Sequence, residues 1–298
     1  MSEKYRGGGD RIREALNDVR ISERAFVDIH GKQKIEKDLG WLAGVRGRFE
    51  QVKNKEGGEL LEYVVMDQMV DADFMGDFDE ENGKDMIDEG TELNVMNTVV
   101  ASEVDDVSAR TDVIVAMNNK MLKEQILSLD ATTSSNPSVV ANKFRKSHKN
   151  KKLPKGFEDL DYVEVEEGLS RRGRFEKVPH FVVGIDEGEA RALVNLLERG
   201  REGMLADWER DERDRLIARV GYKVVDEMYE QSRYIAEAKV DDENLGALRD
   251  YLAQARGKAE KRLVAYGESV EDMSRDETYG MITTMAGNLR GEELRVVA

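Results

Sequence analysis

Acidic side chains crowd residues 71–106, and carboxylate oxygens at this density invite comparison with a calcium-binding loop. An EF-hand loop needs acids at positions 1, 3 and 5, Gly at position 6 and Glu at position 12. A loop that begins at Asp77 fails because Asn82 stands at position 6 and Asp88 at position 12. A loop that begins at Asp71 fails at positions 5 and 12. We therefore expect no metal site and no cofactor there, and interpret the stretch as an acidic surface.

A basic tract is the second feature with chemical content. Residues 143–155 contain six Lys, one Arg and no acid, and such a run can neutralise nucleic acid phosphates. Phe144 and Phe157 flank the tract, and aromatic rings can stack on bases. The net charge of the chain is −16, however, and a field of that sign repels nucleic acid on average. Contact with acidic protein surface is therefore the favoured hypothesis, and nucleic acid binding is the alternative.

The acidic and basic segments have complementary charge. Residues 71–106 hold 13 acids and one Lys, whereas residues 143–155 carry a charge of +7. We predict that these segments meet, within one chain or between copies. The predicted basic patch consists of Lys143, Arg145, Lys146, Lys149, Lys151, Lys152, Lys155, Arg171, Arg172 and Arg174. The predicted acidic patch consists of Asp71, Asp73, Asp77, Asp79, Glu80, Glu81, Asp85, Asp88 and Glu89.

Familiar catalytic patterns are missing from the sequence. The chain has no Cys, and its histidines, His30, His148 and His180, show no metal-ligand spacing. There is no GxSxG nucleophile elbow and no phosphate-binding glycine loop. With 62 acids, no carboxylate pair can be singled out for acid–base work. We therefore predict that the protein is not an enzyme and name no catalytic residue. A metal-dependent hydrolase that uses the acids of residues 71–89 is the third hypothesis.

Composition limits the class of protein. Charged residues make up 36% of the 298 residues and aromatic residues 6%, so the core must come from Val, Leu, Met and Ala. No apolar run is long enough for a transmembrane helix, and the N-terminus lacks the apolar core of a signal peptide. We expect a cytoplasmic or virion location and no membrane contact.

The helices and strands that the sequence predicts around these residues indicate an α+β fold. Alternating apolar residues predict strands over 24–30, 92–100 and 111–117, and a helix is expected over 118–129. The run at 60–70 fits either a strand or a helix. Residues 130–142 are rich in Ser, Thr and Asn and predict a loop.

The second half of the chain has clearer patterns. Short strands near 162–165 and 178–185 predict a hairpin. Beyond it, apolar stripes predict a helical region, with Asp186 and Glu189 as a capping box and Ser274 as the cap of the last helix. The predicted organisation is a mixed α/β domain over 1–130, a polar and basic connector over 131–157, and a hairpin followed by a helical domain over 158–298.

These features together favour a structural protein without enzymatic activity. Missing catalytic motifs, segregated charge and long apolar stripes fit a chain that assembles into a ring, shell or filament, as in a virus or phage particle. Its expected partners are copies of itself and other assembly proteins. The alternative is a nucleoprotein that binds nucleic acid through the 143–155 tract.

Overall fold

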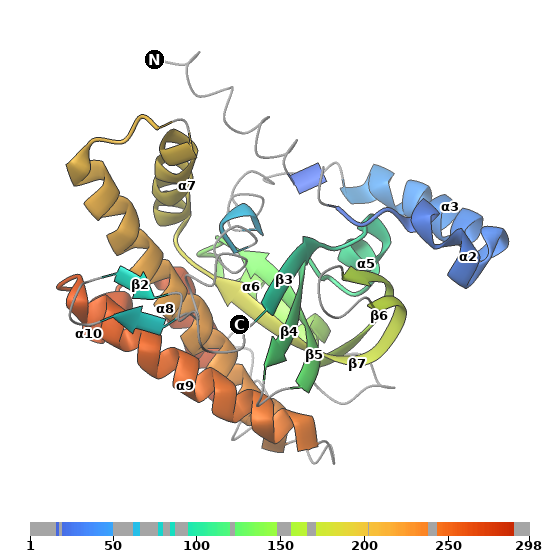
Figure 1. The fold of residues 1–298 in the computed structure, drawn as a ribbon. Helices are drawn as coiled ribbons and strands as arrows, with labels where there is room; N and C mark the ends of the chain where they lie inside the picture. Colours follow the sequence, from blue (N-terminus) through green and yellow to red (C-terminus); the bar gives the residue numbers. More distant parts are fainter. Residues whose placement is uncertain are drawn as a thin grey trace.

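A mixed five-stranded sheet organises the α+β fold of the protein (Figure 1). The computed structural model describes residues 16–17, 20–49, 62–65, 77–79, 84–86, 95–119, 123–147, 156–165, 171–201, 203–237 and 243–288. The strands lie in the order β3-β4-β5-β7-β6, and every neighbouring pair is antiparallel except β5 and β7. Their bounds are β3 Val95–Val100, β4 Val113–Asn119, β5 Lys123–Thr132, β6 Phe157–Val165 and β7 Arg171–Gly184.

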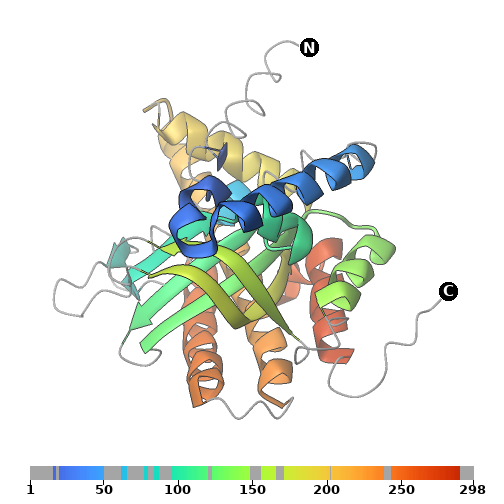
Figure 2. The same cartoon turned by 90° about the vertical axis from the view of Figure 1, so that its right-hand side faces the viewer.

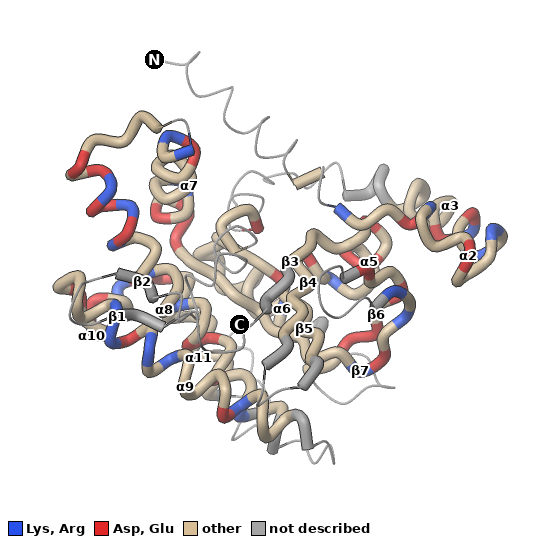
Figure 3. The backbone as a smooth tube through the Cα atoms, in the orientation of Figure 1, with Lys and Arg blue, Asp and Glu red and all other residues tan. Residues whose placement is uncertain are grey.

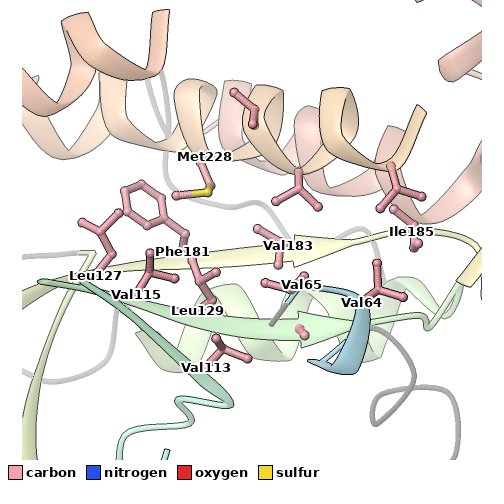
Figure 4. Close-up of a cluster of buried hydrophobic side chains, with 14 of the residues drawn as sticks. Val64, Val65, Val113, Val115, Leu127, Leu129, Phe181, Val183, Ile185 and Met228 are labelled. Carbon is pink, nitrogen blue, oxygen red and sulfur yellow. The ribbon is translucent and has the colours of Figure 1, made fainter. Parts of the chain in front are cut away.

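Helices cover both faces of this sheet. On one face, Leu129 and Val183 pack under residues 62–65, which are helical, and under Met228 of α8 (Figure 4). On the other face, the sheet packs against α3 and α5 at one end and against α6 and α11 at the other. The helices have the following bounds: η1 Glu23–Phe26, α2 Val27–His30, α3 Lys32–Phe49, α5 Glu103–Ser108, α6 Pro137–Ser147, α7 Glu187–Arg201, α8 Asp207–Glu237, α9 Glu243–Ala265, α10 Val270–Met273 and α11 Glu277–Asn288.

The strands predicted near 92–100 and 111–117 are confirmed as β3 and β4, but the helix predicted over 118–129 is wrong. That segment runs into β5 instead. Leu127 and Leu129 are buried on one face of β5, and Ser128 and Asp130 are buried on the other. Leu127, Leu129 and Ala131 alternate with Ser128, Asp130 and Thr132, so a period of two that is typical of a strand was present here and was overlooked.

Two further predictions are wrong. Residues 24–30 form η1 and α2 rather than a strand. The alternation placed Val27 and Ile29 inward, yet both are exposed, and Phe26, which directly precedes Val27, is buried. Residues 130–142 are not a continuous loop, because β5 extends to Thr132 and α6 begins at Pro137. The first five residues of the basic tract therefore belong to a helix.

The hairpin and the C-terminal helical region are confirmed, with β6 and β7 antiparallel and α8 packed beside α9 (Figure 1). Asp186 caps α7 as predicted, because its Oδ1 accepts the Gly188 N–H at 2.8 Å. The Glu189 carboxylate, however, contacts Arg219 and Lys223 of α8 rather than closing a capping box. At α11 the cap is Asp276, not Ser274.

The pairing of β6 with β7 extends to Pro179, and beyond it α8 contacts the same edge of β7. Gln231 donates to the Val182 carbonyl at 2.7 Å and accepts the Val182 N–H at 2.9 Å. Glu227 accepts the Gly184 N–H at 2.8 Å, and burial raises the pKa of this carboxyl well above its usual value. Backbone groups at this edge are thus satisfied by side chains of a helix.

The sheet draws strands from both sides of the predicted connector, since β5 pairs with β7. The predicted domain boundaries stay a prediction. Within the residues that the structure describes, no helix combines the length and apolarity needed to cross a membrane.

Candidate functional site

Two acidic residues meet where β4 begins and β5 ends. Because β4 and β5 are antiparallel, Asp112 lies beside the last residues of β5, and its N–H donates to the Leu129 carbonyl at 2.8 Å. The Asp112 carboxylate accepts the Ala131 N–H at 2.7 Å. Asp130 precedes Ala131 on β5, so this end of the sheet brings two carboxylates together.

A lysine from the following helix completes the cluster. After β5 the chain turns at Asn136, whose side chain accepts the Ser138 N–H at 2.9 Å and starts α6. Lys143 reaches from α6 to the end of β5, where its ammonium contacts the Asp130 carboxylate. The same Nζ lies 2.8 Å from the Ala131 carbonyl oxygen and 4.0 Å from Asp112 Oδ2. Three oxygen-bearing groups therefore surround one cation.

The cluster is largely but not completely buried. The Asp130 side chain is 3% exposed, whereas Asp112 is 14% and Lys143 is 20% exposed. Burial and then the charge of Glu62 raise the pKa of Asp112 well above its usual value. Burial acts to lower the pKa of Lys143, but the charges of Asp130 and Asp112 outweigh it and raise that pKa. Solvent thus reaches a site with strongly interacting charges.

Glu62 belongs to the same site through its charge. It is the first residue of the helical segment 62–65, which is fixed because Val64 and Val65 are buried against the sheet (Figure 4). Among the charges that act on Asp112, those of Glu62 and Asp130 repel it, and that of Lys143 attracts it. The carboxylates around Asp112 therefore outnumber the lysine.

A second buried lysine provides a contrast. Lys223 of α8 is 1% exposed and lies between the Glu189 and Asp276 carboxylates, the latter at 2.8 Å. There Arg219 also contacts Glu189, at 2.8 Å, and shares Glu268 with Arg215, so three cations contact these three acids. Buried charges are normally paired in this way. Within the described residues, Asp112 and Asp130 share one lysine, and this ratio of acids to cations differs from that of the Lys223 network.

The oxygen atoms of this site are suited to a hard cation. Within the described segments, no three His, Asp or Glu side chains converge as a ready-made metal site. Mg²⁺, however, is commonly held by one or two carboxylates together with water and substrate phosphates. Asp112, Asp130 and the Ala131 carbonyl supply oxygen ligands of that type, and the ammonium of Lys143 shows that a positive charge is accepted among them.

Of the predicted basic patch, Lys143 alone is placed in this site by the contacts of the described residues. Arg145 and Lys146 continue α6, and Arg171 begins β7. Arg172 and Arg174 lie on the β6–β7 hairpin beside acids (Figure 3). Their ion pairs are Arg172 with Asp28 and Glu164, and Arg174 with Asp159, Asp161 and Glu176. Outside the described residues lie Lys149, Lys151, Lys152 and Lys155.

The predicted acidic patch is described only in part. Asp77 and Asp79 lie on β1 (Asp77–Asp79), which pairs with β2 (Lys84–Met86) and so with Asp85. The remaining members, Asp71, Asp73, Glu80, Glu81, Asp88 and Glu89, lie outside the described residues. The pairing of the acidic and basic patches therefore stays a prediction.

Sequence reasoning missed Asp112, Asp130 and Glu62. A usable signal existed, since Asp112 stands at the start of the strand predicted over 111–117 and Asp130 follows the next apolar residues. The helix wrongly predicted over 118–129 hid this signal, because it removed the strand that carries Asp130.

A serine and a histidine lie on the same face of the sheet as Asp130. The Ser128 hydroxyl and His180 Nδ1 are 2.8 Å apart, joining β5 to β7. Both side chains are buried, at 0% and 3% exposure. A nucleophile has to reach its substrate, so we interpret this buried pair as part of the core.

Comparison of the chain with protein-family models, with curated proteins and with solved structures gives no match. The function must therefore be inferred from the site itself.

Proposed function

We propose that this protein is a metal-dependent phosphodiesterase that hydrolyses nucleic acid at the Asp112–Asp130–Lys143 site. The observation that carries the proposal is the position of the Lys143 ammonium, held by the Asp130 carboxylate and the Ala131 carbonyl beside Asp112. Two carboxylates and a carbonyl that share one lysine, at the solvent-accessible end of a sheet, form a cation site next to a phosphate-binding group.

Each group has a definite part in this chemistry. Asp112 and Asp130 would hold a divalent cation, which can polarise a phosphoryl oxygen and lower the pKa of bound water. Lysine is a common phosphate ligand, and the charge of Lys143 would stabilise negative charge on the phosphate during the reaction. Asp112 is oriented by its bond to the Ala131 N–H, so both carboxylates are fixed relative to β5.

The reaction is a hydrolysis and needs no further co-reactant. The oxygen of a water molecule bonds to phosphorus as the bond from phosphorus to one sugar oxygen breaks. One water proton goes to the departing sugar oxygen, and the other remains with, or is released from, the new phosphate monoester. Nucleic acid is the favoured class of phosphodiester because α6, which supplies Lys143, also contains Arg145 and Lys146 and no acid.

The test is cleavage of defined nucleic acids by the purified chain. Plasmid DNA, single-stranded DNA and RNA are incubated with Mg²⁺ or Mn²⁺, and in parallel with EDTA. Asp112→Asn, Asp130→Asn and Lys143→Met should each lower the cleavage rate at least 100-fold, since removal of one electrostatic catalytic group costs about 10²–10³. Circular dichroism spectra confirm that each variant is folded.

Matched controls exclude a contaminating nuclease. Asp250→Asn and Lys261→Met make the same chemical changes at exposed positions of α9 and should cleave like the wild type. Activity that persists in EDTA or in the Asp112→Asn variant would contradict the proposal, as would the absence of cleavage of all three substrates.

Assembly into a ring, shell or filament stays a prediction. The proposed hydrolysis neither requires nor excludes it, because the site consists of residues from one chain.

A further inference from the structure

Of the described helices, α3 and α6 have the most positive charge. The sequence of α3 contains five cations and two acids, and that of α6 contains three cations and no acid. Both have a charge of +3 in a chain whose net charge is −16. In Figure 2, α3 crosses α5 and its C-terminal end projects on the side of the molecule where α6 lies.

We propose that the exposed face of α3 around Trp41 contacts the nucleic acid substrate. This inference rests on the proposed function, because it assigns a second contact surface to the same substrate. It names a surface outside the catalytic cluster, and the occupant to which it commits is a nucleic acid strand.

The first half of α3 is firmly attached to the sheet. Lys34 forms ion pairs with Asp38 at 2.7 Å and with Asp161 at 3.1 Å. The Asp38 carboxylate accepts a hydrogen bond from the hydroxyl of the buried Tyr162 at 2.6 Å. Ile35 is buried beneath the helix. The position of α3 relative to the sheet is therefore fixed by charges, a hydrogen bond and apolar packing.

The opposite face of α3 presents an aromatic ring with open surroundings. Trp41 is 45% exposed, and Lys37, one turn earlier on the same face, is exposed as well. Gly40 and Gly44 are the nearest small residues, and a Cβ added at either would meet no atom within 4 Å. A planar ring next to a cation, without bulky neighbours, is suited to stacking on a base beside a phosphate.

Ion pairs neutralise part of the charge of α3, since Lys32 pairs with Glu36 and Lys34 pairs with Asp38 and Asp161. Of the acids of α5, Asp105 is buried and Asp106 forms an ion pair with Arg20 at 3.4 Å. Exposed apolar residues of α2, Val27 and Ile29, would also fit a protein partner. We choose nucleic acid because the charge of α3 has the sign that phosphates require, opposite to that of the chain as a whole.

The chain contains two tryptophans, which makes a specific fluorescence test possible. Trp41 and Trp208 are both exposed, at 45% and 68%, and Trp208 lies at the acid-rich start of α8. Trp208→Phe leaves Trp41 as the only tryptophan, and Trp41→Phe leaves Trp208. Each variant is titrated in EDTA with single-stranded and duplex DNA oligonucleotides. We expect saturable quenching of Trp41 emission and no quenching of Trp208.

Binding measurements quantify the contact. Loss of one stacked base weakens affinity by roughly 5- to 150-fold, so Trp41→Ala should raise the dissociation constant by a factor in that range, and Trp208→Ala should not. Lys37→Gln should reduce the slope of log K against log salt concentration by about 0.9 for duplex DNA, because one phosphate contact is lost.

The outcomes separate this inference from the proposed function. Cleavage by the wild type, without quenching of Trp41 and with unchanged affinity of Trp41→Ala, would refute the contact and leave the hydrolase proposal intact. Quenching of Trp41 without cleavage would support the contact and refute the hydrolase. If Trp41→Ala instead converts a dimer to a monomer in light scattering and DNA does not quench Trp41, the face binds a second copy and the inference is wrong.

Discussion

Replacing Lys143 by methionine should destabilise the fold and make its stability depend on divalent cations. The substitution keeps the length of the side chain but leaves Asp130, 3% exposed, beside Asp112 without an ammonium. Removal of one partner of a buried ion pair costs about 3–5 kcal/mol. Since Lys143 is still 20% exposed, we expect the lower end, about 3 kcal/mol of the free energy of unfolding.

A metal ion should restore much of this loss. If Asp112, Asp130 and the Ala131 carbonyl bind a divalent cation, the cation can occupy the place of the missing ammonium. A ligand at 100 times its dissociation constant stabilises the folded state by about 2.7 kcal/mol. In the wild type the lysine competes for the same oxygens, so stabilisation by the metal should be smaller there than in Lys143→Met.

The assay is urea unfolding of three proteins, each with Mn²⁺ and with EDTA. The third protein is Lys223→Met, which also removes a buried lysine from between two carboxylates. There Glu189 keeps its contact with Arg219, and Asp276 accepts the Asp186 N–H at 2.9 Å, so we expect no rescue by metal. If Mn²⁺ stabilises Lys143→Met no more than the wild type or Lys223→Met, the cation site has been misidentified.

Three further predictions test the scaffold. Gly184→Ala should destabilise the fold by about 1–3 kcal/mol in urea unfolding, since an added Cβ would lie 2.6 Å from a backbone carbonyl oxygen of β5. The control is Gly280→Ala, where an added Cβ would have no contact closer than 3.7 Å, and this variant should be neutral or stabilising. Burial raises the pKa of Asp105 to about 6, so the contribution of this carboxyl to the free energy of unfolding is complete below pH 4 and is lost as the pH rises to 6. The Tyr162 amide, which donates to Asp105 at 2.8 Å, should report this titration in NMR spectra. A midpoint near pH 4 would contradict the prediction. Tyr162→Phe should cost about 0.5–2 kcal/mol, because it removes the bond to Asp38, and thermal unfolding unchanged from the wild type would show that this bond does not hold α3.

Local patterns were sufficient for elements with one exposed face. The apolar stripes predicted for the helical region are borne out by α7, α8 and α9. Asp186 was identified as a cap from its type and position alone. In each case the buried and exposed sides differ in polarity, and the sequence records that difference directly.

The candidate site could not be predicted because it depends on tertiary contacts. Asp112 and Asp130 meet only through the register of β4 and β5, which no local pattern in the sequence specifies. Lys143 was noticed as one charge in a basic run, whereas its role follows from the return of α6 to the end of β5. The alternation at 24–30 was misleading because Phe26, rather than its neighbours, is buried.

The pairing of Gln231 with the Val182 backbone has a consequence for how copies of this chain can associate. Strands at the margin of a sheet recruit strands from other molecules when their peptide groups are unpaired. Here an amide side chain already engages both peptide groups, and the helix behind it physically bars an incoming strand. Sheet extension from this margin would therefore first require α8 to detach, and pairing with another copy through a strand is left to the edges formed by β3 and β6.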